Sequence, residues 1–171
     1  MLNGMDKEGT RPPASSPGRG QPLRVFISYS HKDDTLRGEL ETHLRLLHRQ
    51  GVISVWTDHM IRPGEEWKDK IDKNLDSADI ILLLISADFI ASDYCYGIEL
   101  ERALQRHEAG TAQVIPIILR ATDWESALFG KLQALPAGAR PITLWDDRDS
   151  AWVDVEKGIR KMAEDFRSRR P

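Results

Sequence analysis

The chain has 171 residues, which is enough for about one domain. Hydrophobic residues make up 40% and charged residues 30%, so the chain can bury a core without disulfides or structural metals. Its formal net charge of −3 lacks the basic excess of nucleic-acid-binding proteins, and no nucleic-acid partner is expected.

The cysteine content and the apolar runs indicate the cellular compartment in which the protein is expected. Cys95 is the single cysteine, which excludes an internal disulfide and fits a reducing environment. The longest apolar run, Ile80 to Ile85, is far shorter than the roughly 20 residues that span a bilayer. The N-terminus has no apolar signal-peptide core. We therefore expect a cytoplasmic protein, or a cytoplasmic piece of one, without a membrane segment.

The first part of the chain has the composition of a tail or linker. The stretch GTRPPASSPGRGQPL is dominated by Pro, Gly and Ser and has no apolar period. This predicts a disordered segment over residues 1–23, followed by one domain over residues 24–168.

Strand and helix patterns alternate after this tail. RVFISY predicts a first strand, and Asp33 or Asp34 can cap a following helix that carries a leucine stripe and ends at Gly51. VISVW predicts a second strand. A loop with Pro63 and Gly64 follows it and leads to a helix with apolar residues at a spacing of four.

The second half repeats this alternation. DIILLLIS predicts a central strand buried on both faces, followed by a helix from Ser92 or Asp93 to near Gly110. QVIPIIL predicts a fourth strand and PITLW a weaker fifth, whose Pro141 suits a sheet edge. The last helix carries an apolar stripe that ends at Phe166.

These elements predict an α/β fold with three layers, in which helices cover both faces of a five-stranded parallel sheet. Ligands bind such sheets beyond the carboxyl ends of the strands. The loops after the strands are therefore where functional residues are expected.

Several kinds of site are excluded by the sequence. It contains no Gly-x-Ser-x-Gly elbow, and its first strand is followed by SYSHKDD rather than by a Gly-rich phosphate loop. No two of the five histidines have the i, i+4 spacing of a helical metal site, so no metal is expected. A response-regulator receiver would need an aspartate where the third strand ends, and Ser86 is there instead.

The ordered set of motifs resembles a bacterial TIR (Toll/interleukin-1 receptor) domain. The resemblance covers about Arg24 to Arg167 and implies a flavodoxin-like fold, in agreement with the parallel sheet predicted from the elements. The motifs are VFISYSHKDD, W-T-D-x-x-I-x-P-G-E-E-W, ADIILLLISADFIASDYC, ELERAL and VIPIILR.

The resemblance implies two kinds of function. Enzymatic TIR domains cleave the nicotinamide–ribose bond of NAD+ with a glutamate on the helix after the third strand, and Glu99 matches it. We expect an NAD+ glycohydrolase or cyclase in bacterial signalling or defence, with NAD+ as substrate and no cofactor. One alternative is a non-catalytic adaptor. Another is a nucleoside or nucleotide N-glycosidase similar to the 2-deoxyribosyltransferases.

One carboxylate is chemically sufficient for this reaction. Glycosidases protonate their leaving oxygen with a second carboxyl group, whereas the pyridinium of NAD+ leaves as neutral nicotinamide. The carboxylate then only has to stabilise positive charge on the ribose. Glu99 and Glu101 both border the apolar stripe of their helix, so spacing hardly separates them, and either can be a solvated charge.

The resemblance also assigns aromatic residues. Trp67 and Trp124 match aromatics that line the pocket in NAD+-cleaving relatives, although Trp67 can also start an apolar stripe and Trp124 can anchor its loop. Many enzymatic relatives carry Trp four residues before the glutamate, where this chain has Cys95. Either Tyr94 supplies the aromatic face or the pocket is impaired. No histidine that could activate Cys95 as a nucleophile is identifiable nearby.

Polar residues at strand ends complete the predicted site. Ser30 and Ser86 can contact ribose or phosphate, or cap helices, and a capping role is favoured for Asp58. The loop that carries Asp58, Pro63 and Gly64 corresponds to the assembly loop of the family, the alternative being a plain surface connection. The expected partners are NAD+, other copies of the chain through TIR–TIR contacts, and other TIR or sensor domains.

Overall fold

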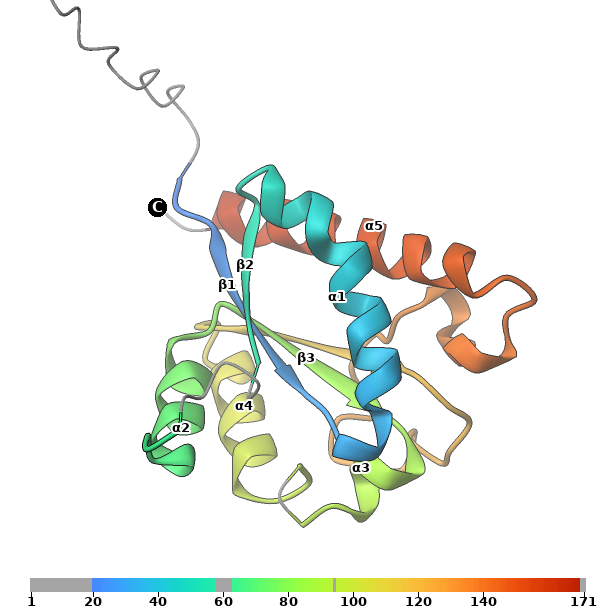
Figure 1. Cartoon of the computed structure of the whole chain (residues 1–171), viewed down its shortest axis with the longest axis horizontal. Coiled ribbons are helices and arrows are strands. Elements are labelled where there is room, and N and C mark those ends of the chain that lie inside the picture. The colour runs from blue at the N-terminus through green and yellow to red at the C-terminus, as the bar shows by residue number, and fades with distance from the viewer. Residues whose placement is uncertain (1–19, 58–62, 94, 170–171) are drawn as a thin grey trace, which may run out of the picture.

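The computed structural model describes residues 20–57, 63–93 and 95–169 (Figure 1). Strands alternate with helices along these ranges, as predicted. The strands are β1 (Leu23–Ser28), β2 (Ile53–Trp56), β3 (Ile80–Ile85) and β4 (Gln113–Ile118). The α-helices are α1 (Asp34–Arg49), α2 (Trp67–Ser77), α3 (Ala87–Ala91), α4 (Ile98–Glu108) and α5 (Arg148–Arg169). The short 3-10 helices are η1 (His31–Asp33), η3 (Ala137–Ala139) and η4 (Ile142–Leu144).

The strands form one parallel sheet with the order β2–β1–β3–β4. The strand order reverses at β1, because the chain adds β2 on one side of it and β3 on the other. Ligands of open parallel sheets bind beyond the carboxyl ends at such a switch point. The carboxyl ends of β1, β2 and β3 are therefore the first place to look for a site.

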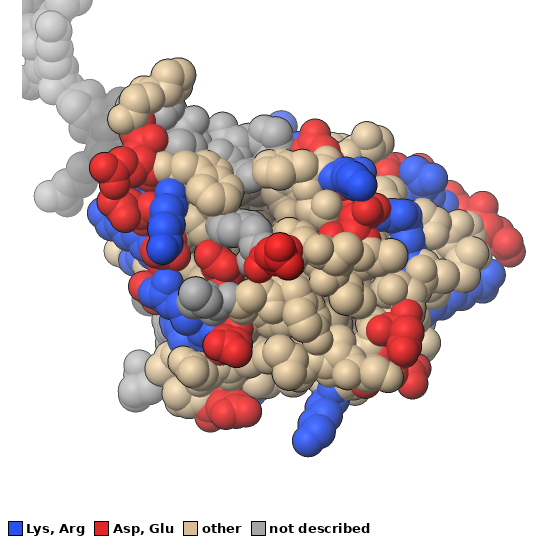
Figure 2. Space-filling view, turned by 90° about the horizontal axis from the view of Figure 1, so that it is seen from below, with Lys and Arg blue, Asp and Glu red and all other residues tan. Residues whose placement is uncertain are grey.

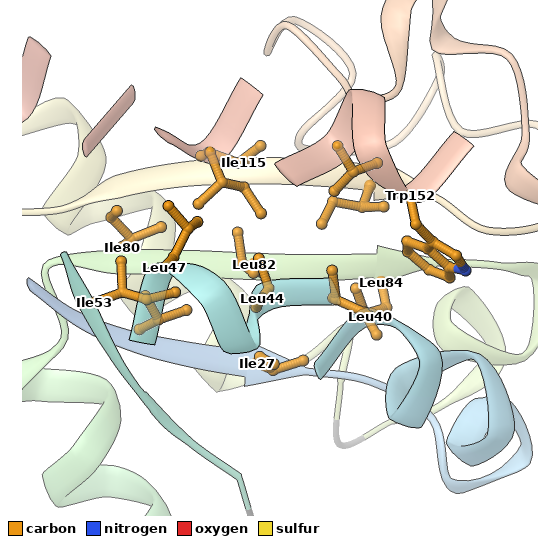
Figure 3. Packing of buried hydrophobic residues seen from close by; sticks show 14 of the residues in the cluster. Ile27, Leu40, Leu44, Leu47, Ile53, Ile80, Leu82, Leu84, Ile115 and Trp152 are labelled. Carbon is orange, nitrogen blue, oxygen red and sulfur yellow. The ribbon is translucent and has the colours of Figure 1, made fainter. Parts of the chain in front are cut away.

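Two layers of helices cover the sheet, which confirms the predicted three-layer α/β architecture. Helices α1 and α5 lie on one face, and α2 and α4 lie on the other (Figure 1). All six residues of β3 are buried, and they alternate between the two faces. Figure 3 shows the α1 side, where leucines of α1 pack on β1 and β3. Burial of each such Leu or Ile contributes about 1.5–3 kcal/mol.

The predicted fifth strand over Pro141–Trp145 is wrong, because this segment forms the short 3-10 helix η4. The place beside β4 is taken by Leu135, whose N–H donates to the carbonyl of Pro116 at 2.9 Å. The carbonyl of Leu135 accepts from the Ile118 N–H, also at 2.9 Å. Pro136 follows immediately and has no N–H, so the ladder stops after one bridge.

The amino end of the domain is anchored to the last helix. The guanidinium of Arg167 donates to the main-chain carbonyls of Gln21 and Val52, at 3.1 and 3.0 Å. Residues 1–19 of the predicted tail lie outside the described residues. Among the helices that are described, none has the length and apolar character needed to cross a membrane.

Candidate functional site

A small hollow lies at the carboxyl ends of β1 and β2. Its volume of about 20 Å³ is close to what a single water molecule or hydroxyl group needs. The residues around it come from β1, the end of β2, and helices α2 and α4. They are Phe26, Ile27, Ser28, Tyr29, Trp56, Ile71 and Glu99. The predicted catalytic residue therefore lies at the carboxyl ends of β1 and β2, where both polar and apolar groups surround it.

Glu99 belongs to the first turn of α4, which begins at Ile98 rather than at the predicted Ser92 or Asp93. Gly97 precedes the helix with non-helical φ and ψ angles of −95° and −131°. A Cβ at Gly97 would lie 2.5 Å from the Asp93 carbonyl oxygen, so a glycine is required here. A carboxylate in the first turn also interacts favourably with the helix N-terminus.

The structure distinguishes Glu99 from Glu101, which helical spacing alone could not do. Glu99 is partly buried and lines the hollow, whereas Glu101 is exposed to solvent. Leu100, between them, is buried in the core on the α2 and α4 side of the sheet. The side chain of Glu99 is thus the one that can meet a ligand at the strand ends.

Cys95 fastens the turn before α4 to the end of β1. It is 3% exposed, and its thiol donates to the Tyr29 carbonyl at an S···O distance of 3.4 Å. Its N–H donates to Ser92 Oγ at 3.2 Å. A buried thiol with a main-chain acceptor is typical of a structural cysteine, not of a nucleophile.

The two predicted serines make capping contacts. Ser30 Oγ accepts from the Lys32 N–H at 3.4 Å at the start of η1. Ser86 Oγ accepts from the Phe89 N–H at 3.1 Å at the start of α3. Neither serine lines the hollow, where the hydroxyl-bearing strand residue is Ser28.

The predicted aromatics, Trp67 and Trp124, do not line the hollow either. Trp67 is 44% exposed at the start of α2, and Trp124 packs against the core on the α2 and α4 side. The aromatics that line the hollow with Glu99 are Phe26, Tyr29 and Trp56, and sequence analysis placed Trp56 only at the end of a strand. The signal that could have found it is its in-register position opposite Phe26 on β1, because both side chains then lie on one face of the sheet.

A cluster of paired charges occupies the adjacent strand ends. Asp33 is 3% exposed and accepts from Ser86 and from Arg120, the latter at 3.0 Å. Arg120 also donates to Asp88, which lies 3.5 Å from the Lys32 ammonium. The hydrogen bond from Arg120 holds the pKa of the Asp88 carboxyl below its usual range, and the Lys32 charge adds to this effect.

The same contact raises the pKa of the Arg120 guanidinium. Two acids and two bases cancel in this cluster, so it offers no net charge to a phosphate. It joins the segments that follow β1, β3 and β4 instead. Figure 2, a view on to the lower side of Figure 1, likewise shows acidic and basic side chains interspersed on that face.

The predicted assembly loop is described only in part. Asp58 and the predicted pocket residue Tyr94 both lie outside the described residues. Pro63 and Gly64 form an exposed turn, and Gly64 has a positive φ of 88°. Only glycine adopts this conformation without strain, which explains the Pro-Gly pair at this turn.

A larger groove of about 570 Å³ lies elsewhere, along the outer side of β4 between α4 and α5. It borders the start of β4, away from the carboxyl ends of the strands, and it contains none of the predicted site residues. Within the described ranges, no group of three His, Cys, Asp or Glu side chains is placed to hold a metal ion.

A protein of Sinorhizobium fredii (strain NBRC 101917 / NGR234), named as the uncharacterized protein y4lF, is 56% identical over 139 residues. This match covers 81% of the chain and 43% of y4lF, so the chain spans less than half of that relative.

Two solved structures of TIR domains are among the matches. The TIR domain of the Toll-related receptor TRR-2 from Hydra magnipapillata has a TM-score of 0.54 at 21% identity, and the match covers 80% of this chain and 97% of that one. The TIR domains of the activated Roq1 resistosome, which recognises the effector XopQ, have a TM-score of 0.48 at 18% identity, with 83% and 84% covered. The family profile described as the TIR domain matches residues 25–161. The chain therefore belongs to the TIR domain family.

Proposed function

We propose that this TIR domain is an NAD+ glycohydrolase, or a cyclase, that uses Glu99 and acts in bacterial signalling or defence in the cytoplasm. The observation that carries the proposal is the place of Glu99. Its side chain lines a hollow with Phe26 and Trp56 at the carboxyl ends of β1 and β2. The rings of Phe26 and Trp56 lower the local dielectric on their side of the hollow, which strengthens the interaction of a carboxylate with a developing positive charge.

The reaction requires few catalytic groups besides this carboxylate. When the bond between nicotinamide and ribose C1′ breaks, its electron pair moves to the pyridinium nitrogen and the ring leaves as neutral nicotinamide. Positive charge develops on the ribose, and the Glu99 carboxylate stabilises it. Water then adds to C1′ and releases a proton, or a nucleophile within the same molecule closes a ring. No general acid is needed, in contrast to ordinary glycoside hydrolysis.

Self-association is part of the proposal. The hollow beside Glu99 has room for a hydroxyl group but not for a dinucleotide. A second copy of the chain, bound through the turn at Pro63 and Gly64, would supply further walls for the substrate. Activity is then expected to rise with protein concentration.

The decisive experiment compares Glu99→Gln with Glu101→Gln. The assay is nicotinamide release from NAD+, with the protein at high concentration or clustered on beads. Loss of the Glu99 charge removes the stabilisation of the ribose cation, so the rate should fall by about a hundredfold or more. Glu101 is exposed, and its variant should keep nearly all activity. Equal rates in wild type and Glu99→Gln would refute the assignment.

A second candidate function is a non-catalytic adaptor, and Cys95 favours it. Many enzymatic relatives carry tryptophan at this position, whereas Cys95 is a small buried residue that fastens a turn. An adaptor would release no nicotinamide from NAD+, whether the protein is clustered or dilute. It would still bind other copies of itself or other TIR domains.

A further inference from the structure

The groove along the outer side of β4 is the partly filled place of a further strand. Leu135 pairs with Ile117 in a single parallel bridge, and the residues just before Leu135 belong to no strand. Helix α5 lies directly on this bridge, because a Cβ at Gly158 would be 2.7 Å from the Leu135 side chain. The first half of β4 therefore borders a groove of about 570 Å³ instead of a neighbouring strand. Sites for small molecules have volumes of roughly 300–1,000 Å³.

The main chain of β4 offers little to an added strand at this groove. Alternate residues direct their N–H and C=O groups outward, and these are Val114, Pro116 and Ile118. The Val114 N–H already donates to His107 Nδ1 at 3.1 Å, and Pro116 has no N–H. The Ile118 N–H donates to the carbonyl of Leu135. Because an extended peptide would find no free donor here, the occupant has to be recognised by side chains.

The charged and polar side chains of the groove come from separate elements. Lys131 belongs to the loop after β4 and Lys161 to α5, and both are exposed without an ion pair to a described residue. His107 is in the last turn of α4, and since its Nδ1 accepts the Val114 N–H, its Nε2 carries the ring proton and can donate. Asp165 is the one acidic residue of the lining. Two positive charges and one negative charge leave the groove with a net charge of +1.

Apolar side chains lie beside these donors. Leu132, Leu135 and Met162 line the groove, and each is only partly buried against the core. A bare inorganic anion would leave this apolar surface in water, and a neutral hydrocarbon would make no use of the lysines. The lining is therefore complementary to an apolar body that ends in an anionic group.

We infer that the groove binds a small organic anion with an apolar body, such as a phosphate ester or a carboxylate. Its charged group meets Lys131 and Lys161, and its body covers Leu132 and Met162. Asp165 lies one helical turn after Lys161 and limits the negative charge that the groove accepts, which favours one anionic group over several. This site is separate from the hollow beside Glu99, and it does not depend on the proposed NAD+ cleavage.

The test is equilibrium dialysis of the full chain with four probes. Two are apolar anions, 1-naphthyl phosphate and 1-naphthoate. The other two are the neutral 1-naphthalenemethanol and inorganic phosphate. The double variant Lys131→Gln/Lys161→Gln removes both positive charges of the groove. Lys157→Gln is the matched control, because Lys157 is an exposed lysine on α5 that does not line the groove. Thermal melting checks that each variant folds.

Both apolar anions should bind the wild type more tightly than the neutral probe or inorganic phosphate. The double variant should lower their affinity by about twofold to thirtyfold, while Lys157→Gln changes nothing. Tighter binding of 1-naphthyl phosphate would identify the ligand as a phosphate ester, and tighter binding of 1-naphthoate as a carboxylate. The inference is overturned if neither anion binds saturably, if the neutral probe binds as tightly as the anions, or if the double variant and Lys157→Gln behave alike.

Discussion

Asp33 is an ionisable side chain buried at the junction of three strand ends. Its carboxylate accepts from Ser86 after β3 and from Arg120 after β4, while its main chain lies between β1 and α1. A buried carboxylate is costly unless donors satisfy it, and here two do. Arg120 reaches Asp88 as well, so one guanidinium joins the segments that follow β1, β3 and β4.

This network predicts a specific dependence of stability on pH. The pKa of Asp88 is lowered in the folded protein, chiefly by the hydrogen bond from Arg120. A group with a depressed folded pKa stabilises the fold above its unfolded pKa, near 3.8, and loses that contribution as pH falls through the folded value. We therefore expect the free energy of unfolding of Asp88→Asn to fall less than that of wild type between pH 6 and about pH 3.

Urea unfolding at both pH values measures this difference. Glu164→Gln is the control, because it removes an exposed carboxylate on α5 and should follow the wild-type curve. Parallel pH curves for Asp88→Asn and wild type would show that the ion pair with Arg120 does not stabilise the fold.

The candidate site was predictable from sequence only in part. The resemblance led to Glu99, and the structure places that residue at the expected edge of the sheet. It did not lead to Trp56 or Ser28, whose proximity to Glu99 depends on the register between strands and on where α4 begins. Sequence spacing also gives no means of pairing Asp33 with Arg120, which are 87 residues apart.

At the scale of elements, the start of α4 determines where Glu99 lies. Gly97→Ala would place a methyl group 2.5 Å from the Asp93 carbonyl oxygen, so the turn between α3 and α4 has to move. We expect the variant to lose about 1–3 kcal/mol of stability. Nicotinamide release should fall as well, because Glu99 moves with the turn.

Gly38→Ala is the matched control for this substitution. Gly38 lies within α1, and a Cβ there would meet no atom within 4 Å. Alanine is the better helix former, so this variant should gain about 0.5–1 kcal/mol. Chemical unfolding of both variants measures the contrast. Equal effects would mean that the close approach at Gly97 is relieved without cost.

The elements themselves were predictable to different degrees. Strand β3 is an unbroken apolar run, and α1 carries a leucine stripe at helical spacing. Both patterns are clear in the sequence, and both elements formed where predicted. The helix predicted from Ser92 or Asp93 begins at Ile98, because the turn around Gly97 interrupts it. The prediction of a fifth strand failed because PITLW begins with Pro141, which has no N–H for a ladder, and its buried residue Ile142 packs beneath α5 in a 3-10 helix.

At the scale of the whole molecule, the parallel sheet brings the parts of the site together at one end. Because all four strands are parallel, the segments after β1, β2, β3 and β4 meet at the same edge. The hollow beside Glu99 and the charge cluster around Asp33 therefore lie at the same edge of the sheet. The turn at Pro63 and Gly64 follows β2, so it belongs to the same end of the molecule as the hollow.

This arrangement leads to the prediction that Gly64 shapes a surface for contact between copies of the chain. Gly64 and Gly110 are matched, because both have positive φ angles, of 88° and 74°, and a Cβ at either would meet no atom within 4 Å. Valine at either position therefore imposes a similar local strain. Gly110 precedes β4 at the opposite end of the sheet, away from the predicted assembly loop. Gly64→Val should reduce self-association and nicotinamide release together, whereas Gly110→Val should change stability alone. Light scattering over a concentration series, combined with thermal melting, measures both effects. If the two variants associate equally well, the turn at Gly64 is a plain surface connection and the contact between copies lies elsewhere.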